Sequence, residues 1–205
     1  MRYRNKSEKL VSGVGFNDLI DQPVYIGGVL DYTYQLWKGM IDRCYSSGAL
    51  SRCPTYSGCK VSEEFLTYST FKKFVTGLKG FGCRDVLGRR YQMDKDLLGD
   101  GRTYSRDTIC FVPQMVNKFL TDSRSARGDL PIGVSRGRKV GMFYSYVSVS
   151  GKRVHLGTFR DPVAAFECYK AHKEGLARKI ALEVEGLVDE RVVDSLKDYH
   201  VKMGV

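Results

Sequence analysis

The sequence predicts an α+β protein, with N-terminal helices and a hairpin in its first part and a small sheet followed by a long helix in its second. Three observations lead to this expectation. Apolar residues recur at helical spacing over residues 32–45. Two short apolar runs flank a glycine-rich turn at residues 99–101, and strict alternation of side chains runs through Phe143–Val149.

The first part of the chain is predicted to be mainly helical. Residues 1–30 are expected to form an arm or an edge strand. A helix over residues 32–45 is followed by a Ser-, Pro- and Gly-containing loop over residues 48–58. A second amphipathic helix is predicted over residues 62–78, where a phenylalanine stripe faces one side. We expect this stripe and Trp37 to belong to a core rather than to a base-stacking surface.

A hairpin followed by a short helix is predicted for residues 91–119. Tyr91 begins the first strand, and Ile109–Val112 is the second. Pro113 suits the first position of a helix, which then runs through Phe119. The polar stretch after this helix is the best linker candidate.

The last part of the chain is predicted to be a sheet followed by helices. Ser150-Gly151 forms the turn after the alternating strand, and residues 153–156 resume the alternation. Asp161 can cap a helix that has Pro162 at its first position and that ends near Leu182. A last amphipathic helix is expected over residues 187–199.

These elements divide the chain into a first module at residues 1–120, a linker at 121–130, a sheet module at 131–182 and a helical extension at 183–205. Gly133 and Gly157 lie at the ends of the predicted strands, where we expect them to allow close backbone approach.

The charge of the chain predicts an anionic partner. Lys and Arg exceed Asp and Glu by 33 to 23, which gives a formal charge of +10. Nucleic acid is the obvious candidate. No apolar run has the length of a signal peptide or a membrane span, so we expect no membrane partner and a cytoplasmic location. Six cysteines form no CxxC pair, which disfavours zinc and predicts reduced, mostly buried thiols.

The predicted sheet has one apolar side and one basic, aromatic side. The outward side is expected to carry Arg136, Arg138, Tyr144, Tyr146, Arg153 and His155. A major groove admits a narrow β-ribbon, and arginine is the commonest bidentate reader of guanine. Lys139, Lys152 and Arg160 are better placed to contact phosphates. The sequence therefore predicts that this side binds double-stranded DNA.

Residues 133–169 resemble the APETALA2/ethylene-response DNA-binding domain. The resemblance is carried by Gly133-Val134, by the strand around Tyr146, by the His155-Leu156-Gly157-Thr158-Phe159 element and by the paired alanines at 164 and 165. It implies a three-stranded antiparallel sheet that packs on one helix and enters the major groove. Carried over by position, it implies DNA contacts from Arg136, Arg138, Tyr146, Ser148, Arg153 and His155. Ser148 stands where the family usually has arginine, and His155 where it has tryptophan, so the family's target sequence is not assumed.

Residues 92–117 resemble the ββα metal fold of HNH nucleases. Asp94 fits the aspartate at the end of the first strand, and Asn117 fits the residue on the closing helix. The catalytic histidine is replaced by Lys95. Lysine is a poor base at neutral pH unless burial lowers its pKa. The combination of both modules resembles phage-borne proteins related to homing endonucleases, which places the protein in the host cytoplasm if a phage encodes it.

Three functions stay open at this point. The first is a sequence-specific DNA-binding protein with a degenerate nuclease motif. The second is an active endonuclease or nickase, in which Asp94 and Asp96 share one strand face and hold Mg²⁺ or another divalent cation beside Lys95 and Asn117. The third is a basic module that binds RNA or an acidic protein. The oligomeric state is not predicted.

Overall fold

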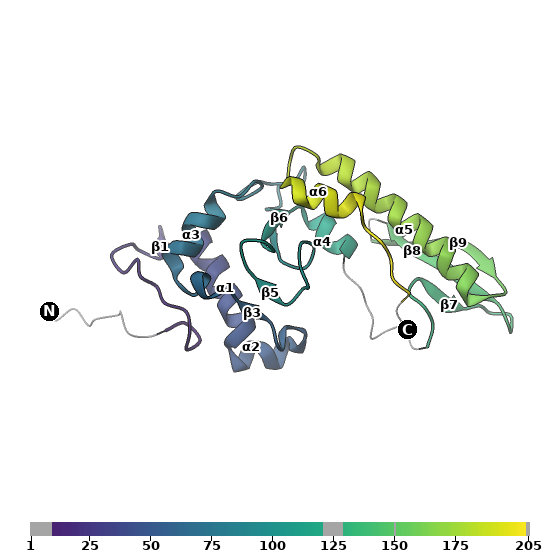
Figure 1. The fold of residues 1–205 in the computed structure, drawn as a ribbon, viewed down its shortest axis with the longest axis horizontal. Helices are drawn as coiled ribbons and strands as arrows, with labels where there is room; N and C mark the ends of the chain where they lie inside the picture. Colours follow the sequence, from purple (N-terminus) through teal and green to yellow (C-terminus); the bar gives the residue numbers. More distant parts are fainter. Residues whose placement is uncertain (1–9, 121–128, 150, 204–205) are drawn as a thin grey trace. The chain divides into compact units, whose positions relative to one another are not determined.

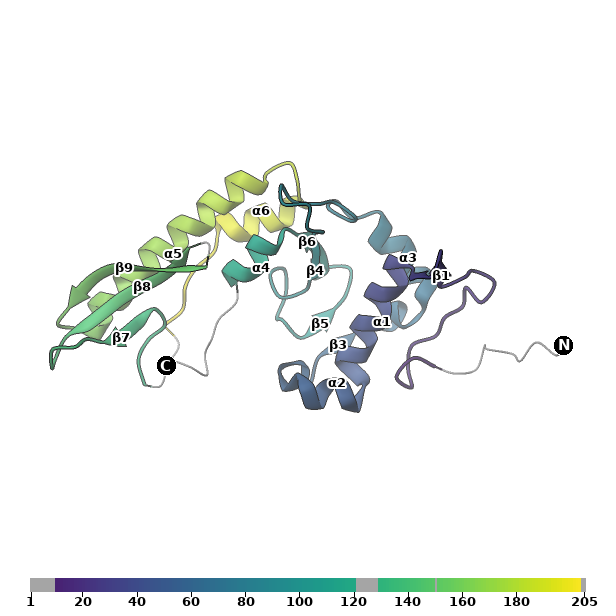
Figure 2. The ribbon, with the colours of Figure 1, turned by 180° about the vertical axis from the view of Figure 1, so that it is seen from behind.

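The computed structural model of the chain describes residues 10–120, 129–149 and 151–203. The described chain is mixed α+β, as predicted (Figures 1 and 2). It divides into two compact units, Met1–Pro113 and Gln114–Val205. This division falls before α4 (Gln114–Leu120), the helix that was expected to close the first module. Of the predicted linker, residues 121–128 lie outside the described part of the chain.

The first unit is organised around helix α1 (Tyr32–Tyr45), which occupies the predicted residues. Asp31 caps the helix by accepting the backbone N–H of Tyr34 at 2.9 Å. Trp37 is fully buried, and its indole N–H donates to the carbonyl of Phe65 at 2.8 Å. Trp37 is therefore a core residue, as expected. The predicted edge strand before α1 is one arm of a small hairpin, formed by β1 (Tyr25–Ile26) and β2 (Val29–Leu30).

Two predictions for the middle of the first unit were wrong. The predicted loop at 48–58 contains α2 (Ser47–Arg52) and the short 3-10 helix η2 (Pro54–Tyr56). The predicted helix at 62–78 is broken into η3 (Glu63–Leu66) and α3 (Tyr68–Thr76).

The break lies at Thr67, whose backbone is extended because the N-terminal segment pairs with it. Phe16 donates its N–H to the carbonyl of Leu66 at 2.8 Å and accepts the N–H of Tyr68 at 3.0 Å. Helical spacing of the phenylalanines survives this break, so the sequence pattern alone does not reveal it. Phe65 and Phe71 are fully buried, which confirms their core assignment.

The predicted hairpin is present in the first unit. Strand β4 (Gln92–Asp94) pairs antiparallel with β6 (Cys110–Val112). All three residues of β6 are buried. The sequence did not predict a further small sheet, in which β3 (Lys60–Val61) and β5 (Thr103–Tyr104) pair in parallel.

The second unit is built on a three-stranded antiparallel sheet with the order β7-β8-β9. Helix α5 (Pro162–Val184) packs along one face of this sheet (Figure 1). The core between them contains Val134, Val147, Phe166 and Tyr169. Asp161 caps α5 by accepting the N–H groups of two residues, as predicted. The strands are β7 (Val134–Arg136), β8 (Phe143–Val149) and β9 (Lys152–Phe159).

Gly133 has a backbone and a neighbour that no other residue would tolerate. Its φ is +79°, and a Cβ atom built on it would lie 2.2 Å from ring carbons of Tyr169. Its carbonyl also accepts the N–H of Tyr146 at 2.8 Å, which extends the ladder between β7 and β8. The close approach predicted at this end of the sheet is confirmed.

Helix α6 (Glu190–Lys197) packs against α5 within the second unit. Its buried residues Val192, Val193 and Leu196 form the apolar side that the sequence predicted. The chain after α6 returns to the sheet, where Val201 joins the core. Among the described helices, none is both long and apolar enough to cross a membrane.

Candidate nucleic-acid interface

The face of the β7-β8-β9 sheet opposite α5 carries a cluster of aromatic rings. The ring centroids of Tyr146 and His155 lie 5.0 Å apart, and those of Tyr144 and His155 lie 5.4 Å apart. The two tyrosines are two residues apart on β8, and His155 is the direct partner of Tyr146 on β9. Alternation and register together place the three rings on one face. Thr158 lies beside the cluster, with its hydroxyl 3.3 Å from Nε2 of His155.

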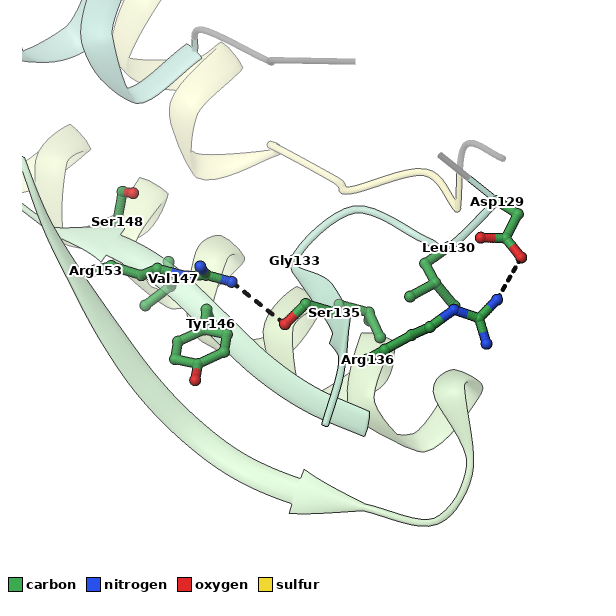
Figure 3. A pocket seen from close by; sticks show the side chains of 10 residues that line it. Asp129, Leu130, Gly133, Ser135, Arg136, Tyr146, Val147, Ser148 and Arg153 are labelled. Atoms are coloured by element: carbon green, nitrogen blue, oxygen red, sulfur yellow. Dashed lines mark hydrogen bonds and ion pairs between the residues drawn. The ribbon is translucent and has the colours of Figure 1, made fainter. Parts of the chain in front are cut away.

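The guanidinium of Arg153 lies over the Tyr146 ring of this cluster. Its guanidinium carbon is 3.8 Å from the centroid of the Tyr146 ring. Nη2 of Arg153 donates to Oγ of Ser135 at 3.4 Å, across the middle strand (Figure 3). Stacking on a ring restricts the rotation of an arginine side chain and leaves most of its N–H donors directed outward. Arg153 is exposed to solvent, and its contacts with Tyr146 and Ser135 restrict its side chain to one orientation.

The prediction for the side of the sheet on which Arg136 lies was wrong. Arg136 pairs with Phe143, which pairs with Phe159, and both phenylalanines pack against the core on the α5 side. Directly paired residues share a face, so the side chain of Arg136 starts from that side. Arg136 is nevertheless exposed, because it ends the short edge strand β7. It reaches along the edge of the sheet to Asp129, with an Nη2–Oδ2 distance of 2.7 Å (Figure 3).

Ser135 takes the outward position that was assigned to Arg136. It pairs with Tyr144, on the outward face. The signal for this was present in the sequence, because a period of two counted from the buried Val134 places residue 135 outward and residue 136 inward. Asp129 and Thr158 were also missed, since their contacts depend on loops and register that no local pattern specifies.

We call Ser135, Tyr144, Tyr146, Ser148, Arg153 and His155 the reading face. Exposed cationic residues surround it on strand ends and on the β7–β8 turn: Arg136, Arg138, Lys139, Lys152 and Arg160. Arg138 is fixed to the face through its backbone N–H, which donates to the hydroxyl of Tyr144 at 3.2 Å. A hollow of about 500 Å³ lies beside Ser135, Tyr146 and Arg153 at one side of this surface (Figure 3).

In the first unit, Asp94 ends strand β4 and turns the chain. Its Oδ1 accepts the backbone N–H groups of Asp96 and Leu97, each at 2.9 Å. Asp96 consequently lies beyond the strand, so the expectation that strand alternation places both aspartates on one face was wrong. Burial raises the pKa of the Asp94 carboxyl, and the two backbone hydrogen bonds oppose this shift.

Lys95 points into the first unit and is held there. The residue is 5% exposed, and its ammonium group donates to Oδ1 of Asp96 and to the carbonyl of Gly101. The rings of Tyr56 and Tyr104 lie 5.6 and 5.4 Å from Nζ. These contacts tie Lys95 to the loop after β4.

Asn117 lies on α4 in the second unit, whereas Asp94 and Asp96 lie in the first. Its side chain is half-buried. Within the described residues, no three His, Cys, Asp or Glu side chains are grouped closely enough to hold a metal ion. Of the cysteines, Cys44, Cys59 and Cys110 are buried, while Cys53 and Cys83 are exposed.

Comparison of the chain with protein-family models, with curated proteins and with solved structures gave no significant match.

Proposed function

We propose that this protein is a sequence-specific double-stranded DNA-binding protein whose reading face lies in the major groove. The observation that supports this most directly is Arg153, which is exposed, stacked on Tyr146 and hydrogen-bonded to Ser135. An arginine held in this way has little conformational entropy left to lose on contact with a guanine edge. A chain with formal charge +10 also attracts the phosphate backbone at long range.

The surroundings of Arg153 suit the same partner. Tyr144, Tyr146 and His155 offer a cluster of rings, packed edge-on or tilted against one another, that can contact sugars and thymine methyl groups. The exposed residues Arg138 and Lys139 on the turn are placed to contact phosphates, and so are Lys152 and Arg160 at strand ends. Arg136 can exchange its exposed partner Asp129 for a phosphate at little cost, because surface ion pairs contribute about 0–1 kcal/mol.

We further propose that the protein is a non-cleaving relative of HNH homing endonucleases. In the resemblance to HNH nucleases, Lys95 stands where the family has its catalytic histidine, and the ammonium group of Lys95 is engaged by Asp96 and Gly101. A general base needs a free lone pair near the attacking water. The contacts of Lys95 favour a structural role, and we expect the DNA to remain uncut.

A matched pair of variants tests the binding proposal. A duplex is first selected from a random pool with the full chain, and binding to it is compared with binding to scrambled DNA. We expect Arg153→Ala to lose about 1–3 kcal/mol of discrimination between the two. Arg178→Ala removes the same charge from an exposed position on α5 and should change discrimination by less than about 0.5 kcal/mol.

Two other results would reassign the function. Equal loss of affinity for selected and scrambled DNA in Arg153→Ala would make Arg153 a phosphate contact, and tighter binding of RNA than of any duplex would overturn the DNA proposal.

Incubation of the selected duplex with wild-type protein and Mg²⁺ or Mn²⁺ tests the nuclease alternative. Nicks that disappear in Asp94→Ala, with binding retained, would establish it.

A further inference from the structure

Residues 83–91 form a closed hairpin in the first unit, which we call the tip hairpin. Tyr91 donates its N–H to the carbonyl of Cys83 at 2.9 Å, and Arg84 and Arg90 pair as an isolated antiparallel bridge. Asp85 then organises the turn. Its Oδ1 accepts the N–H groups of Leu87 and Arg89 at 2.9 and 3.0 Å. The turn is thus fixed by its own backbone and by one carboxylate.

The base of the tip hairpin is anchored in the core of the unit. Tyr91 is 6% exposed. The guanidinium of Arg90 lies 4.3 Å from the centroid of the Tyr32 ring. Phe81, just before the hairpin, packs against Tyr32 and Phe111 with centroid separations of 5.6 and 5.5 Å. A hydrogen-bonded turn on a packed base presents its end residues to solvent.

The end of this hairpin is apolar. Val86 is fully exposed, and Leu87 is 70% exposed. The hairpin carries three arginines, of which Arg84 and Arg89 lie on the turn and Arg90 at the base, and its one acidic residue is Asp85. Arg89 lies 2.7 Å from Oδ2 of Asp85 and holds the pKa of that carboxyl below its usual value through a hydrogen bond. The hairpin therefore carries a net positive charge around two exposed aliphatic side chains.

We propose that the Val86-Leu87 tip is a wedge for the minor groove of duplex DNA. Apolar side chains that are inserted between base steps unstack them and bend the duplex, while arginines bind the narrow groove and its phosphates. This inference rests on the proposed function, because it assigns the same duplex partner to the first unit.

Charge and shape together favour a duplex as the partner of this tip. A protein partner would need an apolar groove for two aliphatic residues next to acidic groups for the arginines of the turn, whereas a duplex offers base steps that an apolar wedge can enter and phosphates beside them. Arg84 uses one donor of its guanidinium for the carbonyl of Gly88, at 2.6 Å. An arginine has five N–H donors, so it can hold the turn and bind a phosphate at the same time.

The test uses the full chain and the duplex selected with it, labelled at both ends for energy transfer and carrying 2-aminopurine at successive positions. We expect wild-type protein to bend the duplex and to raise 2-aminopurine fluorescence at one step. The double variant Val86→Ser with Leu87→Ser should abolish both signals while it weakens binding by only about tenfold. The variant no longer buries two aliphatic side chains in the DNA, but the base pairs that these side chains would separate stay stacked, which offsets part of the loss. Both residues are exposed, so the variant should fold normally.

The matched control is Ile26→Ser with Val29→Ser, which removes an exposed aliphatic pair from the β1–β2 hairpin of the same unit. It should retain the bend and the fluorescence signal. If wild-type protein binds the duplex with sensitivity to Arg153→Ala, yet bends it equally with and without Val86 and Leu87, the wedge is overturned and the proposed function stands. If no duplex is bound at all, both are overturned. A wild-type dimer that the tip variant dissociates would assign the tip to a second copy of the chain instead.

Discussion

At the scale of single residues, three side chains carry most of the functional argument. Arg153 is stacked and exposed, Lys95 is buried and engaged, and Arg136 begins on the side of the sheet opposite to the one expected. The sequence shows that all three residues are basic and can donate hydrogen bonds. The orientations of Arg153 and Lys95 depended on contacts with Tyr146, Asp96 and Gly101 that no local pattern specifies, whereas the side of Arg136 follows from counting alternate residues from Val134.

Gly133 allows a residue-scale prediction about stability. Gly133→Ala should destabilise the protein by about 3 kcal/mol, because the residue has positive φ and its new methyl group would collide with the ring of Tyr169. Urea unfolding measures the change. Gly175→Ala is the control, since Gly175 lies inside α5 with no atom near its missing Cβ, and it should stabilise by about 0.5–1 kcal/mol. Equal effects of the two substitutions would contradict the close approach of Tyr169.

At the scale of elements, pairing between distant segments decided what local patterns could not. The alternating strand β8 was predicted residue by residue, because a half-buried strand has a period of two. The helix predicted over residues 62–78 is broken because Phe16 pairs on both sides of Thr67. The parallel pair β3 and β5 has two residues in each strand, too few for any periodicity to show.

The turn that ends β4 allows an element-scale prediction about pH. Burial raises the pKa of Asp94 above its ordinary value of 3.8, so the folded state keeps this proton at pH values where the unfolded state has lost it. The contribution of Asp94 to stability therefore falls as pH rises from 3.8 through the raised pKa. Asp94→Asn keeps an oxygen that can accept both backbone N–H groups and removes the half-buried charge. It should gain stability relative to wild type as the pH approaches 7.

Urea unfolding of wild type and Asp94→Asn between pH 4 and pH 7 measures the difference between their free energies of unfolding. Other carboxyls have the opposite pH dependence, which is the same in both proteins and cancels in this difference. Asp31, Asp42 and Glu174 have lowered pKa values and stabilise the fold less as pH falls. A loss of stability in Asp94→Asn at pH 7, together with a Mg²⁺-induced rise in the Tm of wild type alone, would instead indicate a cation site at Asp94.

At the scale of the whole molecule, we expect charge to set the strength of DNA binding and the reading face to set its selectivity. The formal charge of +10 comes from residues spread along the chain, and exposed arginines occur in both units, around the reading face and on the tip hairpin. Neither unit alone accounts for the basic character of the protein. We therefore expect a large electrostatic contribution to DNA affinity that depends on salt.

Salt dependence gives the whole-molecule prediction. DNA affinity should fall by roughly a thousandfold between 50 and 200 mM salt if about six phosphates are neutralised. Arg138→Ala with Lys139→Ala should reduce the slope of log affinity against log salt by about two, since both residues are exposed on the β7–β8 turn. The control, Arg178→Ala with Lys179→Ala, removes two exposed charges from α5 and should leave the slope nearly unchanged. A flat salt response of the wild-type protein would count against duplex binding.

The sequence by itself determined the α+β class, the positions of α1, β8 and α5, the hairpin of β4 and β6, and the basic aromatic character of one sheet face. These features follow from periodicity, capping residues and composition, which are local properties of a chain. Only the tertiary structure decided that Phe16 breaks the helix predicted over residues 62–78, that Lys95 is buried against Asp96 and Gly101, and that β3 and β5 pair in parallel. Each of these depends on contacts between residues or strands whose pairing is set by the packing of the whole unit.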